Sequence, residues 1–355
     1  LWSQLGNESN TARLHTKLAH GFWSFLGDKD KGSEHHRMAL SILEKKPESV
    51  ELADLYEDIS RKLWHSGQSA ESKGYALKAF ELAKKLNAYE VLAGCHYDLG
   101  FLSGASGEYQ KAMEHFEQGL KIALENNLIM TARIIYNSLC LDYWARGEYQ
   151  KHFETCRKAL ETARTAGDMY SMGWTKCRLA ICQMGIGEMQ EALALCEEAL
   201  AMGKKIKHSR LLTYAMVAFG YYYCFRGEFN TASQCLKEGY ELARKAEDYQ
   251  FLGYAAHALG WVLVESGDYA GGEEYLKESS SIFENAGDMD VQHILVLPNL
   301  AAECLMRGEV NEAEKLIEKC CEYADRTGNR KGIALAEKLK GILFRHQKNW
   351  EQSVQ

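Results

Sequence analysis

The sequence predicts an all-α fold built from helical hairpins stacked one on the next. Glycines recur along the whole chain at intervals of 40 residues, with one interval of 41, and only two prolines occur in 355 residues. Ala, Leu, Glu and Lys are abundant, which favours helix. A fixed period of this length is typical of repeat proteins, in which each repeat is one supersecondary unit. The recurring glycines are Gly27, Gly67, Gly107, Gly147, Gly187, Gly227, Gly267 and Gly308.

Each glycine is expected to end a first helix, helix A, and to precede a second, helix B. An acidic residue usually follows the glycine, which suits the positive N-terminal end of a new helix. Breaks such as AGD at 166–168 and 286–288 then close the unit. Two amphipathic helices cannot cover their own apolar faces, so each hairpin has to be stabilised by its neighbours.

Helix A carries a constant pair of positions before the turn glycine. In the seven units from Gly67 onward, the residue eight positions earlier is large and apolar, and the residue seven positions earlier is small, as required where two helix backbones approach closely. The small residues are Ser60, Gly100, Cys140, Ala180, Gly220, Gly260 and Ala301.

Helix B shows its own pattern after the glycine, since offsets of 2, 5 and 9 lie on one helical face. Five residues past the glycine stand Ala112, Ala192, Ala232, Gly272 and Ala313, with His152 as the exception. Nine residues past it stand Phe116, Cys156, Cys196, Leu236, Leu276 and Ile317.

This ordered pattern resembles the tetratricopeptide repeat over residues 10–355. The segment from Ala256 to Tyr269, AHALG through GDY, is among the clearest copies. The period of 40 exceeds the family's usual 34, and no proline ends helix B. Such long repeats are similar to those of the bacterial maltose-regulon activator and of the sensor regions of signal-transducing ATPases and cyclases. The segment PESVELADLY at 47–56 also resembles segments of these sensor regions.

The resemblance implies a right-handed superhelical α-solenoid of about eight to nine hairpins. We expect one array over residues 1–355, with a partial last repeat from about residue 331 and the start of another at 348–351. We also expect the chain to be a piece of a larger protein.

In this family the A helices line the concave wall of the stack and bind the ligand or partner. Carried onto this sequence, the resemblance implies a groove lined by Tyr97, Phe101, Asn137, Trp174, Arg178, Tyr214, Tyr221, Tyr254, His257 and Trp261.

Trp174, Tyr214 and Tyr254 occupy one repeat position in three successive units, an arrangement named here the aromatic ladder. Aromatic rings with a few polar groups suit recognition of a peptide, sugar or base. The alternative is that the rings only fill the gaps between A helices. Arg178 can pair with a ligand anion or with Asp142, and a lone residue such as His257 is usually just hydrogen-bonded.

The same resemblance implies a non-catalytic module that senses a small-molecule inducer, a peptide segment or a regulatory protein within a cytoplasmic multidomain signalling or transcription regulator. A general protein-interaction scaffold without a small-molecule ligand is the alternative. Neither a catalytic set nor a metal or cofactor motif is visible. His35 and His36 are adjacent and so point in different directions on a helix, and most of the 11 cysteines are interpreted as small, buried apolar residues. Oligomerisation stays open.

Charge and hydropathy exclude two classes of partner. The net charge is −7 with acidic and basic residues interleaved, which argues against direct nucleic-acid binding. No apolar run approaches the roughly 20 residues that span a bilayer.

The charged group Asp54, Glu57, Asp58 and Arg61 lies near the start of the predicted groove. It is interpreted as a solvated rim.

Overall fold

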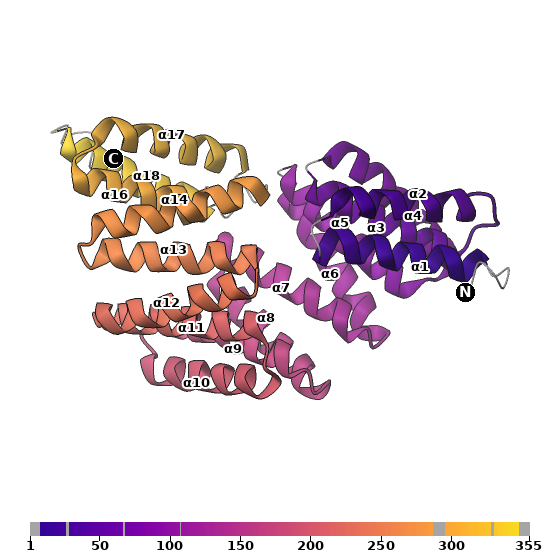
Figure 1. Cartoon of the computed structure of the whole chain (residues 1–355), viewed down its shortest axis with the longest axis horizontal. Coiled ribbons are helices and arrows are strands. Elements are labelled where there is room, and N and C mark those ends of the chain that lie inside the picture. The colour runs from indigo at the N-terminus through magenta and orange to yellow at the C-terminus, as the bar shows by residue number, and fades with distance from the viewer. Residues whose placement is uncertain are drawn as a thin grey trace. The chain divides into compact units, whose positions relative to one another are not determined.

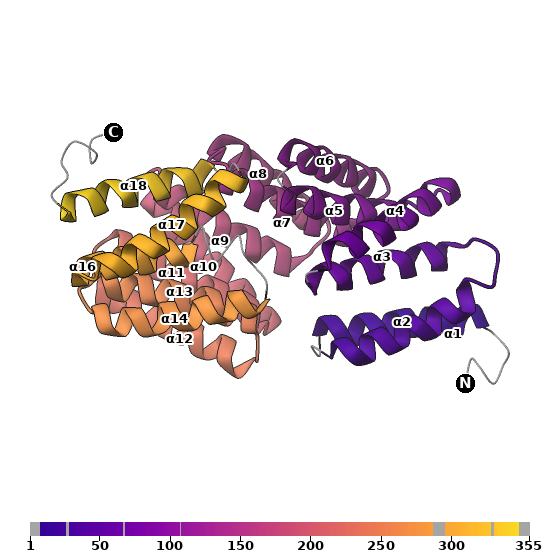
Figure 2. The ribbon, with the colours of Figure 1, turned by 90° about the horizontal axis from the view of Figure 1, so that it is seen from above.

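The chain is described by a computed structural model covering residues 8–25, 28–66, 68–106, 108–286, 295–327 and 330–347. These residues form helices and connecting turns and contain no strand, so the all-α prediction is confirmed (Figures 1 and 2). None of the described helices is long and apolar enough to cross a membrane. Three of the predicted turn glycines, Gly27, Gly67 and Gly107, and the segment 348–351 lie outside the described residues.

The chain divides into two compact units, Leu1–Leu139 and Cys140–Gln355. The prediction of a single array over 1–355 therefore stays a prediction. Unit 1 contains α1 (Glu8–His20), a π-helical turn (Gly21–Phe25), α2 (Lys29–Leu43), α3 (Val50–His65), α4 (Ser69–Leu86), α5 (Tyr89–Ala105) and α6 (Tyr109–Glu125). Helix α7 (Ile129–Ala145) crosses the boundary. Unit 2 contains α8 (Tyr149–Thr165), α9 (Met169–Gly185), α10 (Met189–Ile206), α11 (Ser209–Phe225), α12 (Phe229–Lys245), α13 (Tyr249–Glu265), α14 (Tyr269–Ala286), α16 (Leu297–Arg307), α17 (Val310–Thr327) and α18 (Arg330–His346).

The turn glycines that the structure describes lie where the sequence pattern predicts them. Gly147, Gly187, Gly227, Gly267 and Gly308 have φ values between 71° and 91°, a region that favours glycine. At Gly187 the chain turns back on α9, and the N–H of Glu188 donates to the carbonyl oxygen of Gln183 at 2.9 Å. Such a bond satisfies a carbonyl at the end of helix A before helix B begins.

The small residue seven positions before the glycine contacts the large residue nine positions after it. A Cβ atom added at Gly220 would lie 2.4 Å from Leu236 Cγ, and one at Gly100 would lie 2.6 Å from the Phe116 ring. At Gly260 the added atom would lie 2.8 Å from Leu276 Cγ. The predicted close approach of the two helices is therefore confirmed, and its partner on helix B is identified.

The helices of unit 2 fall into two sets, the A helices and the B helices. Each A helix packs on its own B helix, as in α9 with α10, α11 with α12 and α13 with α14. The A helices α9, α11 and α13 also pack on one another in sequence. No comparable packing joins α10 to α12 or α12 to α14 in the part of the chain that the structure describes. The helices α9, α11 and α13 therefore form the closer-packed of the two sets.

The close approach at Gly260 is testable by Gly260→Ala. The added methyl group meets backbone as well as Leu276, because it would lie 2.9 Å from the Gly272 carbonyl oxygen. Overpacking of this kind costs about 1–3 kcal/mol and outweighs the roughly 1 kcal/mol that alanine gains in helix propensity. We expect a lower midpoint of urea unfolding.

Gly185→Ala is the matched control, since nothing lies within 4 Å of the added atom at that helical glycine. It should leave the midpoint unchanged or raise it slightly. Equal effects of the two substitutions would contradict the proposed contact.

Candidate functional site

The aromatic ladder forms one continuous cluster on the A helices of unit 2. Trp174 of α9 and Tyr214 of α11 contact each other, with ring centroids 4.7 Å apart. Phe251 of α13 lies 5.2 Å from Trp174 and 6.0 Å from Tyr214, and Tyr254 follows at 5.8 Å from Phe251. The three predicted ring positions are therefore brought together, with Phe251 linking the second ring to the third.

Phe251 is the member that the sequence analysis missed. It stands 16 residues before Gly267, where the two preceding units carry Leu211 and Ser171, so no repeated aromatic marks the position. The available signal was its place three residues before Tyr254, because residues three apart are neighbours on a helix surface.

The ladder rings are neither fully buried nor fully exposed. Trp174, Tyr214 and Tyr254 are each partly exposed, whereas Phe251 is buried. Burial raises the pKa of the Tyr214 hydroxyl, although the positive charge of Arg178 opposes that change. The rings thus pack against one another, as expected if they fill the gaps between A helices, and three of them still expose part of their surface.

Arg178 lies beside this cluster without a carboxylate partner among the described residues. Its side chain is only 8% exposed, and its Nε has no hydrogen-bond partner there. The guanidinium carbon lies 6.0 Å from the centre of the Trp174 ring. The Trp174 Nε1–H is also buried without a partner in the described part of the chain. Two buried donors therefore lie together, although buried donors are normally hydrogen-bonded.

Asp142 does not neutralise Arg178. It pairs instead with Arg146 one turn later on the chain, at 3.7 Å. The alternative in which Arg178 binds Asp142 is therefore not the arrangement in the structure, where the acid forms its ion pair with the arginine at i+4.

The remaining predicted residues of unit 2 are engaged with neighbours. Buried His257 lies 2.7 Å from the side-chain nitrogen of Asn299, as expected for a hydrogen-bonded core histidine. Tyr221 contacts Trp261 at 5.5 Å between ring centroids, and Trp261 donates to Glu265 at 3.2 Å. These rings extend the aromatic surface along α11 and α13.

The predicted residues of unit 1 form a separate group. Tyr97 and Phe101 of α5 pack at 4.8 Å between ring centroids, and Trp64 lies 4.9 Å from Phe101. With Arg61, Ser72 and Asp98 they line a small hollow. Asn137 lies partly buried on α7.

The charged group on α3 is not a solvated rim, so that interpretation is wrong. Glu57 and Asp58 are buried, and Asp58 lies 2.6 Å from His20 and 2.7 Å from His36. Burial opposes ionisation of Asp58, yet the hydrogen bonds from both histidines outweigh it and lower its pKa to about 2. A second ion pair joins Arg61 of α3 to Asp98 of α5 at 3.2 Å. These charged side chains are buried because this face of α3 packs against α1 and α5.

Outside these surfaces, Cys140, His152 and Cys156 of unit 2 are buried, and their ligand-type atoms lie within 4.8 Å of one another. This group is the one in the described residues whose spacing suits a metal ion.

Comparison with known proteins identifies a repeat family in the part of the chain that carries Trp174 and Tyr214. Residues 171–245, from the first turn of α9 to the end of α12, match the tetratricopeptide repeat family. Residues 171–245 are tetratricopeptide repeats. No curated protein sequence matches the chain.

Solved structures extend the tetratricopeptide-like fold beyond that segment. A Rap protein complexed with Competence and Sporulation Factor aligns with a TM-score of 0.61 at 12% identity, covering 98% of this chain and 95% of its own. The Rap conjugation gene regulator of plasmid pLS20, in complex with the Phr* peptide, aligns with a TM-score of 0.61 at 17% identity over 81% and 78%. NprR in complex with its cognate peptide NprX gives 0.54 at 12% identity over 97% and 86%. At these identities the likeness shows the fold.

Asp142 supplies a prediction on pH. Burial raises its pKa to about 6, despite Arg146, from a value near 4 in the unfolded chain. Its contribution to stability is therefore complete below about pH 4 and is lost as the pH rises through 6. The free energy of unfolding of the natural chain should fall across this interval relative to that of Asp142→Asn, by about 1–3 kcal/mol. Urea unfolding of both proteins at several pH values measures it, and parallel pH profiles would refute it.

Proposed function

We propose that the chain is a non-catalytic sensing module that binds its ligand on the aromatic surface of α9, α11 and α13. Trp174, Tyr214 and Tyr254 provide the apolar contacts, and Arg178 receives an anionic group of the ligand. The ligand class is a peptide segment or small-molecule inducer with a carboxylate. We further propose that the module serves a cytoplasmic multidomain signalling or transcription regulator.

The pair of unsatisfied donors supports this proposal most strongly. A buried guanidinium without a counter-ion is costly, and so is a buried indole N–H without an acceptor. A carboxylate offers two acceptor oxygens, so one such group can bond both Arg178 and Trp174. A site that pays this cost when empty recovers it on binding, which is the pattern expected of a recognition site.

The peptide class is supported by the structural neighbours. The plasmid pLS20 regulator is in complex with the Phr* peptide and NprR is in complex with its cognate peptide NprX. An extended peptide can place a terminal or side-chain carboxylate at Arg178 while its apolar side chains contact the ladder.

Arg178→Met should leave the ligand-free chain at least as stable as the natural chain and should weaken binding. Methionine has a similar length and removes an uncompensated buried charge, so the free energy of unfolding should stay equal or rise. The probe is a pool of short synthetic peptides with free C-terminal carboxylates, selected on the immobilised natural chain. Affinity of the selected peptides, measured by calorimetry, should fall at least about 30-fold, the loss expected when one partner of a buried charge pair is removed.

Arg157→Met is the matched control, because Arg157 is exposed on α8 and stacks on Phe153. It should leave peptide affinity unchanged. A marked loss of stability in Arg178→Met would mean that Arg178 already has a structural partner.

Trp174→Ala tests the apolar half of the site. Truncating a central aromatic at an interface typically costs 2 kcal/mol or more, so the selected peptides should bind about 30-fold more weakly. Tyr249→Ala, which removes a ring that is 69% exposed at the start of α13, should have no effect. If both ring variants bind normally while a pull-down recovers one stable protein partner, the chain is the alternative, a protein-interaction scaffold that uses another surface.

A further inference from the structure

Cys140, His152 and Cys156 occupy three repeat positions that meet at one point, and His152 is an exception to the residue usual at its position. Cys140 occupies the small position before the turn, where other units carry Gly, Ala or Ser. His152 stands where the units with Ala112, Ala192 and Ala232 carry alanine. Cys156 occupies the large position that contacts Cys140. Their convergence follows from the fold, because the small and large positions touch in every hairpin where a glycine reports the contact.

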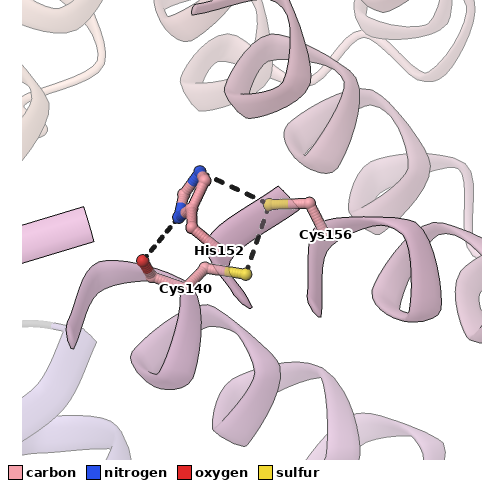
Figure 3. A group of neighbouring side chains, drawn as sticks. All are labelled: Cys140, His152 and Cys156. Carbon is pink, nitrogen blue, oxygen red and sulfur yellow. Dashed lines mark hydrogen bonds between the residues drawn. The ribbon is translucent and has the colours of Figure 1, made fainter. Parts of the chain in front are cut away.

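The ring of His152 is held in the orientation of a metal ligand. Its Nδ1 lies 2.7 Å from the carbonyl oxygen of Cys140 (Figure 3). A carbonyl oxygen only accepts, so Nδ1 carries the hydrogen and Nε2 presents its lone pair. Metal-binding histidines typically donate their second N–H to such a carbonyl.

The lone pair of His152 is directed at sulfur. Its Nε2 lies 3.6 Å from Cys156 Sγ, and the two sulfur atoms lie 3.3 Å apart (Figure 3). His152 and Cys156 are four residues apart and so share one face of α8, while Cys140 comes from α7. All three side chains are at most 3% exposed.

The helix packing alone does not require this histidine. In unit 1, Ser72 stands at the same repeat position and donates to the carbonyl oxygen of Ser60 at 2.8 Å, which is the contact that His152 Nδ1 makes. A serine or alanine therefore suffices for the hairpin. The second nitrogen of His152, which lies beside the Cys156 thiol, is not required for that contact.

We propose that Cys140, His152 and Cys156 bind a thiophilic metal ion, Cu⁺ or Zn²⁺, between α7 and α8. Thiolate and imidazole ligands select these ions, and no carboxylate belongs to the group. Metal–sulfur bonds of about 2.3 Å and metal–nitrogen bonds of about 2.0 Å place sulfur and nitrogen about 3.6 Å apart in a tetrahedral site. That is the observed spacing between Cys156 and His152. The two sulfur atoms have to separate by about 0.5 Å to reach the same geometry.

The two thiols lose their protons when the ion binds, because thiolate is the form that ligates a metal. The group then offers two thiolates and one neutral imidazole to the ion.

Metal loading of the full chain tests the proposal. The reduced, chelator-treated protein receives either Zn²⁺ alone or Cu⁺ alone under anaerobic conditions, and metal per chain is measured after desalting. We expect one ion per chain and a higher melting temperature on loading, since the ion binds only the folded state. Competition with a chromophoric chelator ranks the two ions.

The repeat itself supplies variants that keep the fold. His152→Ala restores the residue of the other units, and Cys156→Leu restores the residue found at Leu236 and Leu276. Each should weaken metal binding at least about tenfold, a loss that outer-shell changes alone can cause, and should cancel the rise in melting temperature. The control is Cys196→Leu, which should leave metal binding unchanged. Cys196 occupies the same repeat position as Cys156, but its unit carries Ala192 where His152 stands.

Unchanged metal affinity in His152→Ala would refute the site. So would a natural chain that retains no more metal than a variant in which Cys140, His152 and Cys156 are all replaced by alanine. So would a reduced protein that binds neither ion and in which Cys140 and Cys156 only form a disulfide in air.

Discussion

The contact between a small residue before each turn and a large residue after it sets the spacing within the hairpins. At Gly100, Gly220 and Gly260 the two helices approach so closely that even a methyl group would overlap the partner side chain. Overlap of this kind cannot be relieved by a rotamer change when backbone lies alongside, as it does at Gly260. The hairpin therefore has one preferred spacing, and repetition every 40 residues passes it to the next unit.

That spacing determines where the A helices of unit 2 present their side chains. Because α9, α11 and α13 pack on one another in sequence, residues at one repeat position fall side by side, and Trp174, Tyr214 and Tyr254 join one cluster. Arg178 is buried beside this cluster and has no carboxylate partner among the described residues. The same constraint brings Cys140 against Cys156 in the hairpin of α7 and α8, where both positions happen to carry sulfur.

Much of the fold and part of the site could be predicted from the sequence. Periodicity located the described turn glycines, the small positions and the ladder, since these depend on local spacing that repeats. It could not supply Phe251, which one unit alone carries, or the partners of α3, whose ion pairs join residues 22 to 38 positions apart. The pairing of Asp142 with Arg146 in place of Arg178 depends on side-chain direction, which spacing leaves open. The sequence showed His152 as an exception to the repeat. That its second ring nitrogen lies beside the Cys156 thiol could be seen only in the structure.

A double-mutant cycle at Gly220 and Leu236 tests the contact most directly. Gly220→Ala with Leu236→Cys reproduces the pair that the preceding hairpin uses, Ala180 with Cys196. Each single substitution should lower the free energy of unfolding, and the double variant should be more stable than the sum of the two losses by about 1 kcal/mol or more, because the smaller partner accommodates the methyl group. Additive losses would show that the two side chains do not meet as described and would remove the basis for the register of the A helices.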